Sequence, residues 1–348
     1  MERRRLRPAT TTEEGETVMA ELHFASGAVA LEQYLVTVDE ADLAEQRACY
    51  ADAGEALAST PLHEGYLETV RQAWEEQVEP RDPDAHHRHV AGVDLRVLAH
   101  ERPGAIVLHA HGGGWTTGHN DMYDEWLGLL RDRAVVTAVS VGYRRAPEHP
   151  YPAAVADLET VAVWLARHGK RELGSDRIIL VGESAGANLI AALLVRLRTS
   201  RPEVLERVAG AVLTYGAFDL ANVLPSHRNS TSATPVISAA ELAWHIRAYA
   251  GDTDLFHPEI SPLWADLDGM PAALFTVGEA DMLVDDSVLL ANRWALAGSP
   301  ARLDIYPEAT HVFDELGTRL GRQARERIAD WMATLSQGAG VALGASPI

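Results

Sequence analysis

The pattern of hydrophobic and polar positions changes near residue 85. Beyond this point, short apolar runs alternate with longer segments in which apolar residues recur every three or four positions. Continuous short apolar runs are typical of strands buried on both faces of a sheet, and the longer segments are typical of amphipathic helices. The alternation therefore predicts an α/β fold with a mostly parallel central sheet flanked by helices.

The elements predicted from this pattern place the chemistry at strand ends. The predicted strands cover residues 105–110, 135–141, 177–181, 209–214, 272–277 and 302–306, and the predicted helices cover 153–168, 185–198, 287–297 and 316–335. Ligands of parallel α/β sheets bind beyond the carboxyl ends of the strands. Candidate catalytic residues are therefore sought in the segments that directly follow each strand.

The predicted catalytic domain, residues 81–335, contains a long insertion at 218–262. This insertion is about twice as long as a simple crossover requires, and it includes a helical pattern at 239–250. Residues 21–80 also have a largely helical pattern. We therefore expect residues 21–80 and the insertion to pack together as a helical cap.

The two ends of the chain, 1–20 and 336–348, are predicted to be flexible tails. The first begins with basic residues but continues with a Thr- and Glu-rich stretch where a secretion signal would be apolar. No apolar run reaches the 18–20 residues or so of a membrane span. We therefore expect a cytoplasmic protein that is not embedded in a membrane.

Charge narrows the classes of partner. The 348 residues include 50 acidic and 30 basic side chains, which gives a formal net charge of −20. Such a surface repels nucleic acids and anionic lipids, so we expect neither as a partner.

The single cysteine, Cys49, cannot form an internal disulfide and is predicted to be a packing residue. We predict no cofactor and no metal.

A candidate nucleophile lies in the segment 182–186, Gly-Glu-Ser-Ala-Gly. It has the form G-x-S-x-G, directly follows a predicted strand and directly precedes a predicted helix. In that setting the serine, Ser184, lies on a sharp turn above the sheet. The N-terminus of the following helix favours negative charge developing nearby.

A glycine-rich segment, His-Gly-Gly-Gly-Trp at 111–115, follows another predicted strand. Successive glycines let backbone N–H groups face a ligand without obstruction by a Cβ atom. A flexible loop or a phosphate-binding loop would be the alternative, but the G-x-x-x-x-G-K-[ST] pattern is absent. Together with the serine motif, the segment predicts an oxyanion hole made by the N–H groups of Gly113, Gly114 and Ala185.

Residues 85–335 resemble the hormone-sensitive-lipase-like branch of the α/β-hydrolases, which includes the microbial family IV carboxylesterases. The resemblance rests on motifs that follow the family's order. These are HGGGW at 111–115, GESAGANL at 182–189, YRRAPEHPYPAA at 143–154, DMLVD at 281–285 and THVF at 310–313. It implies an α/β-hydrolase fold with a helical cap, and it implies that Asp281 and His311 are the catalytic acid and base.

The order of the candidate residues along the chain leads to the same set. In this fold the nucleophile comes first, then the acid, then the histidine. Asp281 follows the predicted strand 272–277, and His311 follows the predicted strand 302–306. Ser184, Asp281 and His311 are therefore predicted to form a catalytic triad.

The sequence departs from the family's usual residues at four positions that flank these motifs. Glu183 stands where Asp is commoner, and Ala187 where Gly is commoner. Met282 replaces a common Pro, and Val312 replaces the Gly that usually follows the histidine. None of the four removes a predicted catalytic group.

Other polar residues near these motifs have structural alternatives that we favour. Asp285 and Asp286 are interpreted as anions at a helix N-terminus. His109 is interpreted as a buried, hydrogen-bonded histidine, and His111 as a brace for the glycine-rich loop. A cluster in the segment 86–89 admits a metal site, but a solvated loop is favoured because no further ligand spacing supports a metal. Its members are His86, His87 and His89.

The prediction is a serine carboxylesterase that hydrolyses small, short-to-medium acyl esters through an acyl-enzyme. An amidase, a lactonase or an acyl transferase could use the same triad. More remote alternatives are a non-catalytic ligand-binding receptor on a hydrolase scaffold and a structural protein. Candidate substrate-binding residues are Trp115, Phe218 and Trp244, each with core packing as its alternative. A homodimer is conceivable through an edge strand at 302–306 together with the last helix.

Overall fold

The computed structural model describes most of the chain. The described residues are 10–11, 17–23, 30–57, 62–76, 82–228 and 236–338, and their side chains are described for 31–52, 62–73, 82–227 and 236–338. Most of the two predicted tails, namely 1–9, 12–16 and 339–348, lies outside the described residues.

A single sheet runs through the described part of the chain, and the predicted mostly parallel sheet is confirmed. Its strand order is β1-β2-β3-β11-β10-β9-β8-β6-β7-β5-β4. Neighbouring strands are parallel from β3 to β7, and antiparallel strands extend the sheet at both ends. The strands are β1 (Thr10–Thr11), β2 (Thr17–His23), β3 (Ala30–Leu35), β4 (His86–Val90), β5 (Val93–Leu98), β6 (Ala105–Ala110), β7 (Val136–Gly142), β8 (Ile178–Glu183), β9 (Val208–Thr214), β10 (Ala273–Gly278) and β11 (Ala301–Tyr306).

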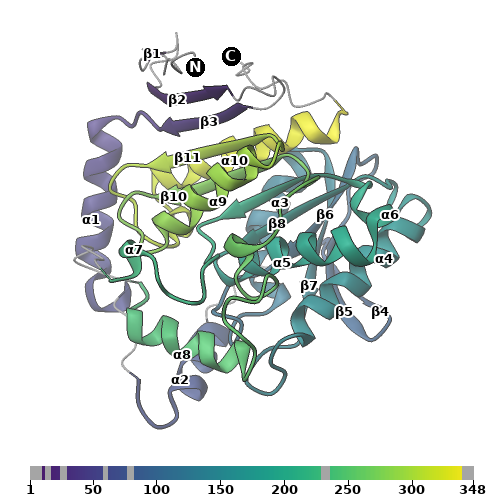
Figure 1. Ribbon diagram of the computed structural model, residues 1–348, viewed down its shortest axis with the longest axis horizontal. Helices are drawn as coiled ribbons and strands as arrows, with labels where there is room; N and C mark the ends of the chain where they lie inside the picture. The colour runs from purple at the N-terminus through teal and green to yellow at the C-terminus, as the bar shows by residue number, and fades with distance from the viewer. Residues whose placement is uncertain are drawn as a thin grey trace, which may run out of the picture.

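Helices cover both faces of the sheet, as Figure 1 shows. The helices are α1 (Glu40–Leu57), α2 (Tyr66–Glu76), α3 (Asp124–Arg133), α4 (Ala153–Leu173), α5 (Ala185–Ser200), α6 (Pro202–Leu205), α7 (Pro225–Arg228), α8 (Ala239–Ala250), α9 (Val284–Leu296) and α10 (Arg319–Ser336). One apolar cluster joins the sheet to α4, α5 and α9, and a second joins it to α3 and α10.

The apolar run of β6 shows why the central strands are hydrophobic throughout. Ile106 and Leu108 belong to the cluster on one face of the sheet, whereas Ala105 and Val107 belong to the cluster on the other face. Successive side chains of a strand point to opposite faces, so a strand covered on both sides has no solvent-facing position.

The prediction that residues 21–80 form a helical cap is wrong for the first part of that segment. Thr17–His23 form β2 and Ala30–Leu35 form β3, and β3 pairs in parallel with β11, so that Leu31 lies opposite Ala301. Leu31 is fully buried. Pairing between β3 and β11 forms hydrogen bonds with backbone N–H and C=O groups of β11 that would be unpaired if β11 lay at the edge of the sheet. This segment therefore extends the sheet and does not cover it.

This pairing also corrects the prediction of a dimer through residues 302–306. That prediction required β11 to lie at the edge of the sheet, but β3 occupies this edge within the same chain. Strand-to-strand association through β11 is therefore blocked as long as β3 is in place.

The predicted solvated loop at residues 86–89 is instead a strand. β4 and β5 pair antiparallel at the far edge of the sheet, with His87 opposite Arg96. The two nitrogens of His87 lie 2.9 Å from an oxygen of Asp94 and 3.1 Å from an oxygen of Asp121. Among the described residues, no group of three or more His, Cys, Asp and Glu side chains has the arrangement of a metal site.

The cap is built from α2 and from α8, which lie side by side in Figure 1. The ring of Tyr66 on α2 meets the ring of Trp244 on α8 edge to face at 5.1 Å. By contrast, α1 packs beside α10, where Arg319 pairs with Asp42 at 2.9 Å. The helix predicted at 239–250 is confirmed. Of the described N-terminal elements, α2 joins it in the cap.

No helix within the described segments combines the length and the apolar character needed to cross a bilayer.

We predict that Arg96→Leu lowers the free energy of unfolding by about 3–5 kcal/mol. Arg96 on β5 donates to both carboxylate oxygens of Asp124, at 2.5 and 3.1 Å, and both side chains are almost completely buried. Its removal leaves a buried carboxylate without its cation. Arg207→Leu is the matched control, since the Arg207–Asp176 pair is about half exposed and such pairs contribute less than about 1 kcal/mol. Equal losses for both variants in urea unfolding would contradict this expectation.

Candidate active site

Ser184 lies on the sharp turn between β8 and α5. Its backbone adopts φ 53° and ψ −120°, a conformation that residues with side chains rarely adopt. The Ser184 N–H donates to the carbonyl of Thr214 on the neighbouring strand at 2.9 Å. The turn therefore holds the serine in a strained conformation at the N-terminus of α5, as the motif predicts.

Gly186 allows the first turn of α5 to approach the end of β6. A Cβ atom at this position would lie 1.9 Å from the carbonyl oxygen of Ala110. Such a distance is impossible, so only glycine fits. This approach brings the glycine-rich loop beside the serine, and a Cβ atom built on Gly112 would lie 3.6 Å from Cβ of Ser184.

The structure brings Ser184, His311 and Asp281 into one chain of contacts. Oγ of Ser184 lies 2.9 Å from Nε2 of His311, and Nδ1 of His311 lies 2.8 Å from Oδ2 of Asp281. The other oxygen of Asp281 accepts from the N–H of Leu283 at 2.9 Å. Because a carboxylate accepts hydrogen bonds, Nδ1 donates, and Nε2 is left to accept the serine proton.

The surroundings of His311 favour its protonated form. Burial on its own lowers the pKa of His311, but the Asp281 carboxylate, together with Glu315 and Asp314, more than offsets this effect. The net effect raises the pKa above its ordinary value of 6.5. The ring of Tyr215 packs edge to face on the imidazole at 4.9 Å and limits its rotation.

Gly112 of the glycine-rich loop lies beside Ser184, and Ala185 directly follows the serine. Gly113 and Gly114 have φ values of 109° and 56°, and Ala185 is the first residue of α5. The N–H of Gly112 donates to the hydroxyl of Tyr123 at 3.2 Å. An oxyanion hole made by the N–H groups of Gly113, Gly114 and Ala185 stays a prediction.

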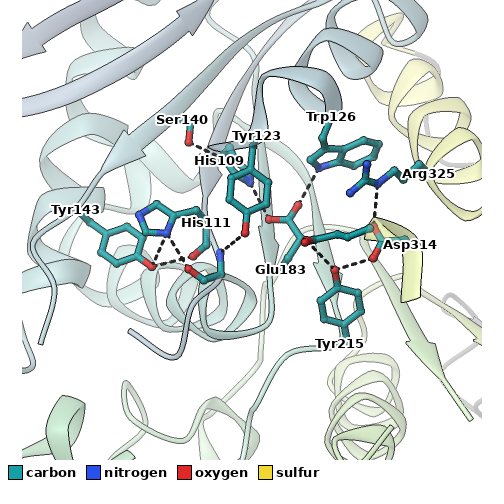
Figure 2. Close-up of polar contacts among 12 residues, drawn as sticks. His109, His111, Tyr123, Trp126, Ser140, Tyr143, Glu183, Tyr215, Asp314 and Arg325 are labelled. Carbon is teal, nitrogen blue, oxygen red and sulfur yellow. Dashed lines mark hydrogen bonds and ion pairs between the residues drawn. The ribbon is translucent and has the colours of Figure 1, made fainter. Parts of the chain in front are cut away.

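A layer of buried polar side chains supports the site, as Figure 2 shows. The carboxylate of Glu183 accepts from Nε1 of Trp126 at 2.9 Å and lies 2.7 Å from Nε2 of His109. Nδ1 of His109 in turn lies 2.8 Å from Oγ of Ser140. Glu183, the residue before the nucleophile, therefore ties β8 to β6, β7 and α3. The predicted buried, hydrogen-bonded role of His109 is confirmed.

A second part of this layer lies behind the imidazole of His311. Asp314 accepts from the hydroxyl of Tyr215 at 2.7 Å and from Nε of Arg325 at 3.1 Å. Figure 2 shows this carboxylate between its two donors. The guanidinium of Arg325 also lies over the ring of Trp126, 5.5 Å from its centroid. Trp126 therefore links the two parts of the layer, because it donates to Glu183 and also contacts Arg325, the partner of Asp314.

The three candidate substrate-binding residues have packing roles. Trp115 is almost fully buried, stacks on Tyr249 at 4.9 Å and donates from Nε1 to Asn188 at 3.2 Å. Phe218, the first residue of the insertion, is fully buried and meets the ring of Phe275 edge to face at 6.3 Å. Trp244 is partly buried between α8 and α2. Contact of these side chains with a substrate stays a prediction.

Asp285 and Asp286 lie in the first turn of α9, but their carboxylates do more than compensate the helix dipole. Asp286 accepts from the N–H groups of Phe218 and Asp219 at 2.6 and 2.7 Å. Asp285 accepts from the N–H of Ser226 at 2.9 Å. The two carboxylates therefore anchor the start of the insertion.

Sequence reasoning missed the residues by which the cap contacts the glycine-rich loop. Thr116, Tyr66 and His245 come from three segments that are far apart in sequence. No motif marks them, and only the positions of α2 and α8 in space bring them together.

Comparison with known proteins places this arrangement in a family. Residues 107–315 match the family of proteins with the alpha/beta hydrolase fold. The chain belongs to this family. The predicted membership of its hormone-sensitive-lipase-like branch is confirmed, as is the predicted class of carboxylic ester hydrolase.

Three similar proteins illustrate the relationship of this hydrolase to its family. The acetyl-hydrolase of Streptomyces hygroscopicus is 30% identical over 77% of this chain and 81% of its own length. Esterase LipI of Mycobacterium tuberculosis is 36% identical over 57% of this chain and 62% of its own. The crystal structure of a hormone-sensitive lipase from a metagenome library has a TM-score of 0.74 and 28% identity, covering 86% of this hydrolase and 99% of that chain.

Proposed function

We propose that this hydrolase cleaves small, short-to-medium acyl carboxylic esters through a Ser184–His311–Asp281 triad and an acyl-enzyme. The observation that carries the proposal is the continuous line of contacts from Oγ of Ser184 through the imidazole of His311 to Asp281, at 2.9 and 2.8 Å. Both distances are those of hydrogen bonds. The first allows proton transfer from the serine to the imidazole, and the second stabilises the protonated imidazole.

In the first half of the reaction, Oγ of Ser184 attacks the ester carbonyl carbon while Nε2 of His311 takes the hydroxyl proton. A carbon–oxygen bond forms, and the carbonyl electrons move onto the oxygen. The N–H groups of Gly113, Gly114 and Ala185 stabilise the resulting oxyanion. The intermediate then expels the alcohol, which receives its proton from His311, and the acyl group stays on the serine.

In the second half, water replaces the alcohol. His311 takes a proton from the water as it attacks the acyl carbon, and then returns the proton to Oγ of Ser184 as the carboxylic acid leaves. Asp281 holds the imidazole in the required tautomer and stabilises its positive form in both halves. Atoms and charges balance with ester and water as the only reactants.

Two further observations support the choice of substrate. A net charge of −20 disfavours polyanionic substrates and is compatible with neutral esters. The similar protein from Streptomyces hygroscopicus is named for hydrolysis of an acetyl group, the shortest common acyl chain. Amide, lactone and acyl-transfer reactions need the same groups, and product analysis with added nucleophiles separates them from hydrolysis.

Ser184→Ala should abolish hydrolysis of p-nitrophenyl butyrate, together with the burst of p-nitrophenol that reports acylation. The substitution removes the nucleophile but keeps the fold, so the unfolding temperature should stay close to that of the wild type. Ser200→Ala, at the exposed end of the same helix, is the matched control and should keep full activity. Hydrolysis by Ser184→Ala at the wild-type rate would refute the assignment.

The acid limb of kcat/KM should have its midpoint above pH 6.5, because protonated His311 cannot accept the serine proton and its pKa is raised. Activity is then lost as pH falls through this raised pKa. Asp281→Asn removes the attraction that raises the pKa, so its midpoint should move to lower pH. In a serine protease with a Ser-His-Asp triad, the corresponding Asp→Asn change costs about 10⁴ in kcat.

The expected pH dependence is checked by measuring kcat/KM for the wild type and for Asp281→Asn between about pH 5 and pH 9. Where turnover of the Asp281→Asn variant is too slow, the rate at which an organophosphate labels Ser184 gives the same midpoint. A midpoint unchanged by Asp281→Asn would show that Asp281 does not control the charge of His311.

A panel of p-nitrophenyl esters should show the highest kcat/KM for acyl chains of up to about eight carbons, and a steep loss beyond them. Each added methylene contributes roughly 0.8 kcal/mol where it can be buried, and nothing where the pocket has ended. The rate measured with Ser184→Ala is subtracted for each ester as background hydrolysis. Highest activity on emulsified long-chain lipid would contradict the proposed substrate class.

A further inference from the structure

The side chain of His245 on the cap helix α8 contacts the predicted oxyanion hole. A Cβ atom built on Gly114 would lie 2.7 Å from both Cγ and Nδ1 of His245. The imidazole therefore packs directly on the backbone of this glycine. A cap residue and an oxyanion-hole residue are in van der Waals contact, with no intervening side chain.

Hydrogen bonds extend this contact in both directions. Nδ1 of His245 lies 2.8 Å from Oγ1 of Thr116, two residues after Gly114, and Nε2 lies 3.1 Å from the hydroxyl of Tyr66 on α2. The Tyr66 hydroxyl donates to Glu241 at 3.3 Å. The side chains of Thr116, Tyr66, Glu241 and His245 are all at most 6% exposed.

The chemistry of these groups fixes the direction of each hydrogen bond. The Glu241 carboxylate accepts, so the Tyr66 hydroxyl donates to it and its oxygen accepts from Nε2–H of His245. Nδ1 then has to accept from the hydroxyl of Thr116. This requires a neutral ring, and burial lowers the pKa of His245 to about 4.

The loop is also held from α2. Nε of Arg71 donates to the carbonyl of Thr116 at 2.9 Å, and Nη2 donates to the carbonyl of Ala146 at 3.0 Å. The N–H of Thr116 in turn donates to the carbonyl of Gly113 at 3.1 Å. Both cap helices thus bind Thr116, whose own hydrogen bond closes the turn that contains the two oxyanion-hole glycines.

We propose that His245 is a positioning residue of the oxyanion hole. It holds the backbone of Gly114 by direct packing and orients Thr116 by a hydrogen bond, so that the cap and the hole are assembled as one unit. This inference rests on the proposed ester hydrolysis at Ser184. An oxyanion donor contributes about 10²–10³ in kcat when it is correctly placed, and small displacements forfeit much of this.

His245→Ala should lower kcat for p-nitrophenyl butyrate by about tenfold to a hundredfold and change KM by less than about threefold, because the hole acts mainly in the transition state. His245→Asn should recover part of the loss, since its amide oxygen can replace Nδ1 as the acceptor for Thr116. Hydrogen exchange of the segment 111–118 should become faster in His245→Ala and return toward the wild-type rate in His245→Asn.

Ile246→Ala is the matched control for loosening of the cap. Ile246 follows His245 on α8 and is buried. Its truncation weakens the packing of the helix without removing the hydrogen bond to the loop. If His245 acted only by stabilising α8, Ile246→Ala and His245→Ala would lower kcat equally.

The results separate this inference from the proposed function. Full kcat in His245→Ala, or unchanged hydrogen exchange at 111–118, overturns the positioning role, and so does an equal loss of kcat in Ile246→Ala. A wild-type protein that does not hydrolyse esters, or that does so without Ser184, overturns the proposed function. In that case the exchange measurement still decides whether His245 holds the loop.

Discussion

The close approach of α5 to β6 determines how the rest of the site is arranged. Because Gly186 has no side chain, the first turn of α5 lies against the carbonyl of Ala110, the last residue of β6. The glycine-rich loop begins directly after that residue, and Ser184 directly precedes the helix. One backbone contact therefore places the glycine-rich loop beside Ser184, and the loop that carries His311 meets the serine through the imidazole.

The N-terminal region contributes to the site from two sides. On α1, the hydroxyl of Tyr50 accepts from the N–H of Thr310, the residue before the imidazole, at 2.8 Å. On α2, Arg71 and Tyr66 hold the glycine-rich loop directly and through His245. Described residues before the catalytic domain thus contact both the loop that carries His311 and the segment that follows the glycine-rich loop.

The central strands, and the positions of Ser184, Asp281 and His311 after strand ends, were predictable because their physical causes are local. A strand buried on both faces must be apolar throughout, as β6 and β8 are, and the reacting groups follow such strands directly. The edge strands lack this signal. β4 has the sequence HHRHV with mostly exposed side chains, a pattern that in isolation is typical of a polar loop.

The contacts of the cap could not be predicted from the sequence for a different reason. Whether Glu32 lies in a cap helix or a strand depends on the free edge of β11, which is formed by residues near the other end of the chain. In the same way, Tyr66, Thr116 and His245 meet only after three segments have docked. Nothing in the local pattern around any of these residues indicates its partner.

The pairing of β3 with β11 also bears on how the chain acquires its structure during synthesis. Leu31 is synthesised 270 residues before its partner Ala301. Contacts between such distant residues carry a large loop-closure cost and form slowly. β3 is therefore made long before it can pair with β11, and until they pair β11 presents an open edge to other chains.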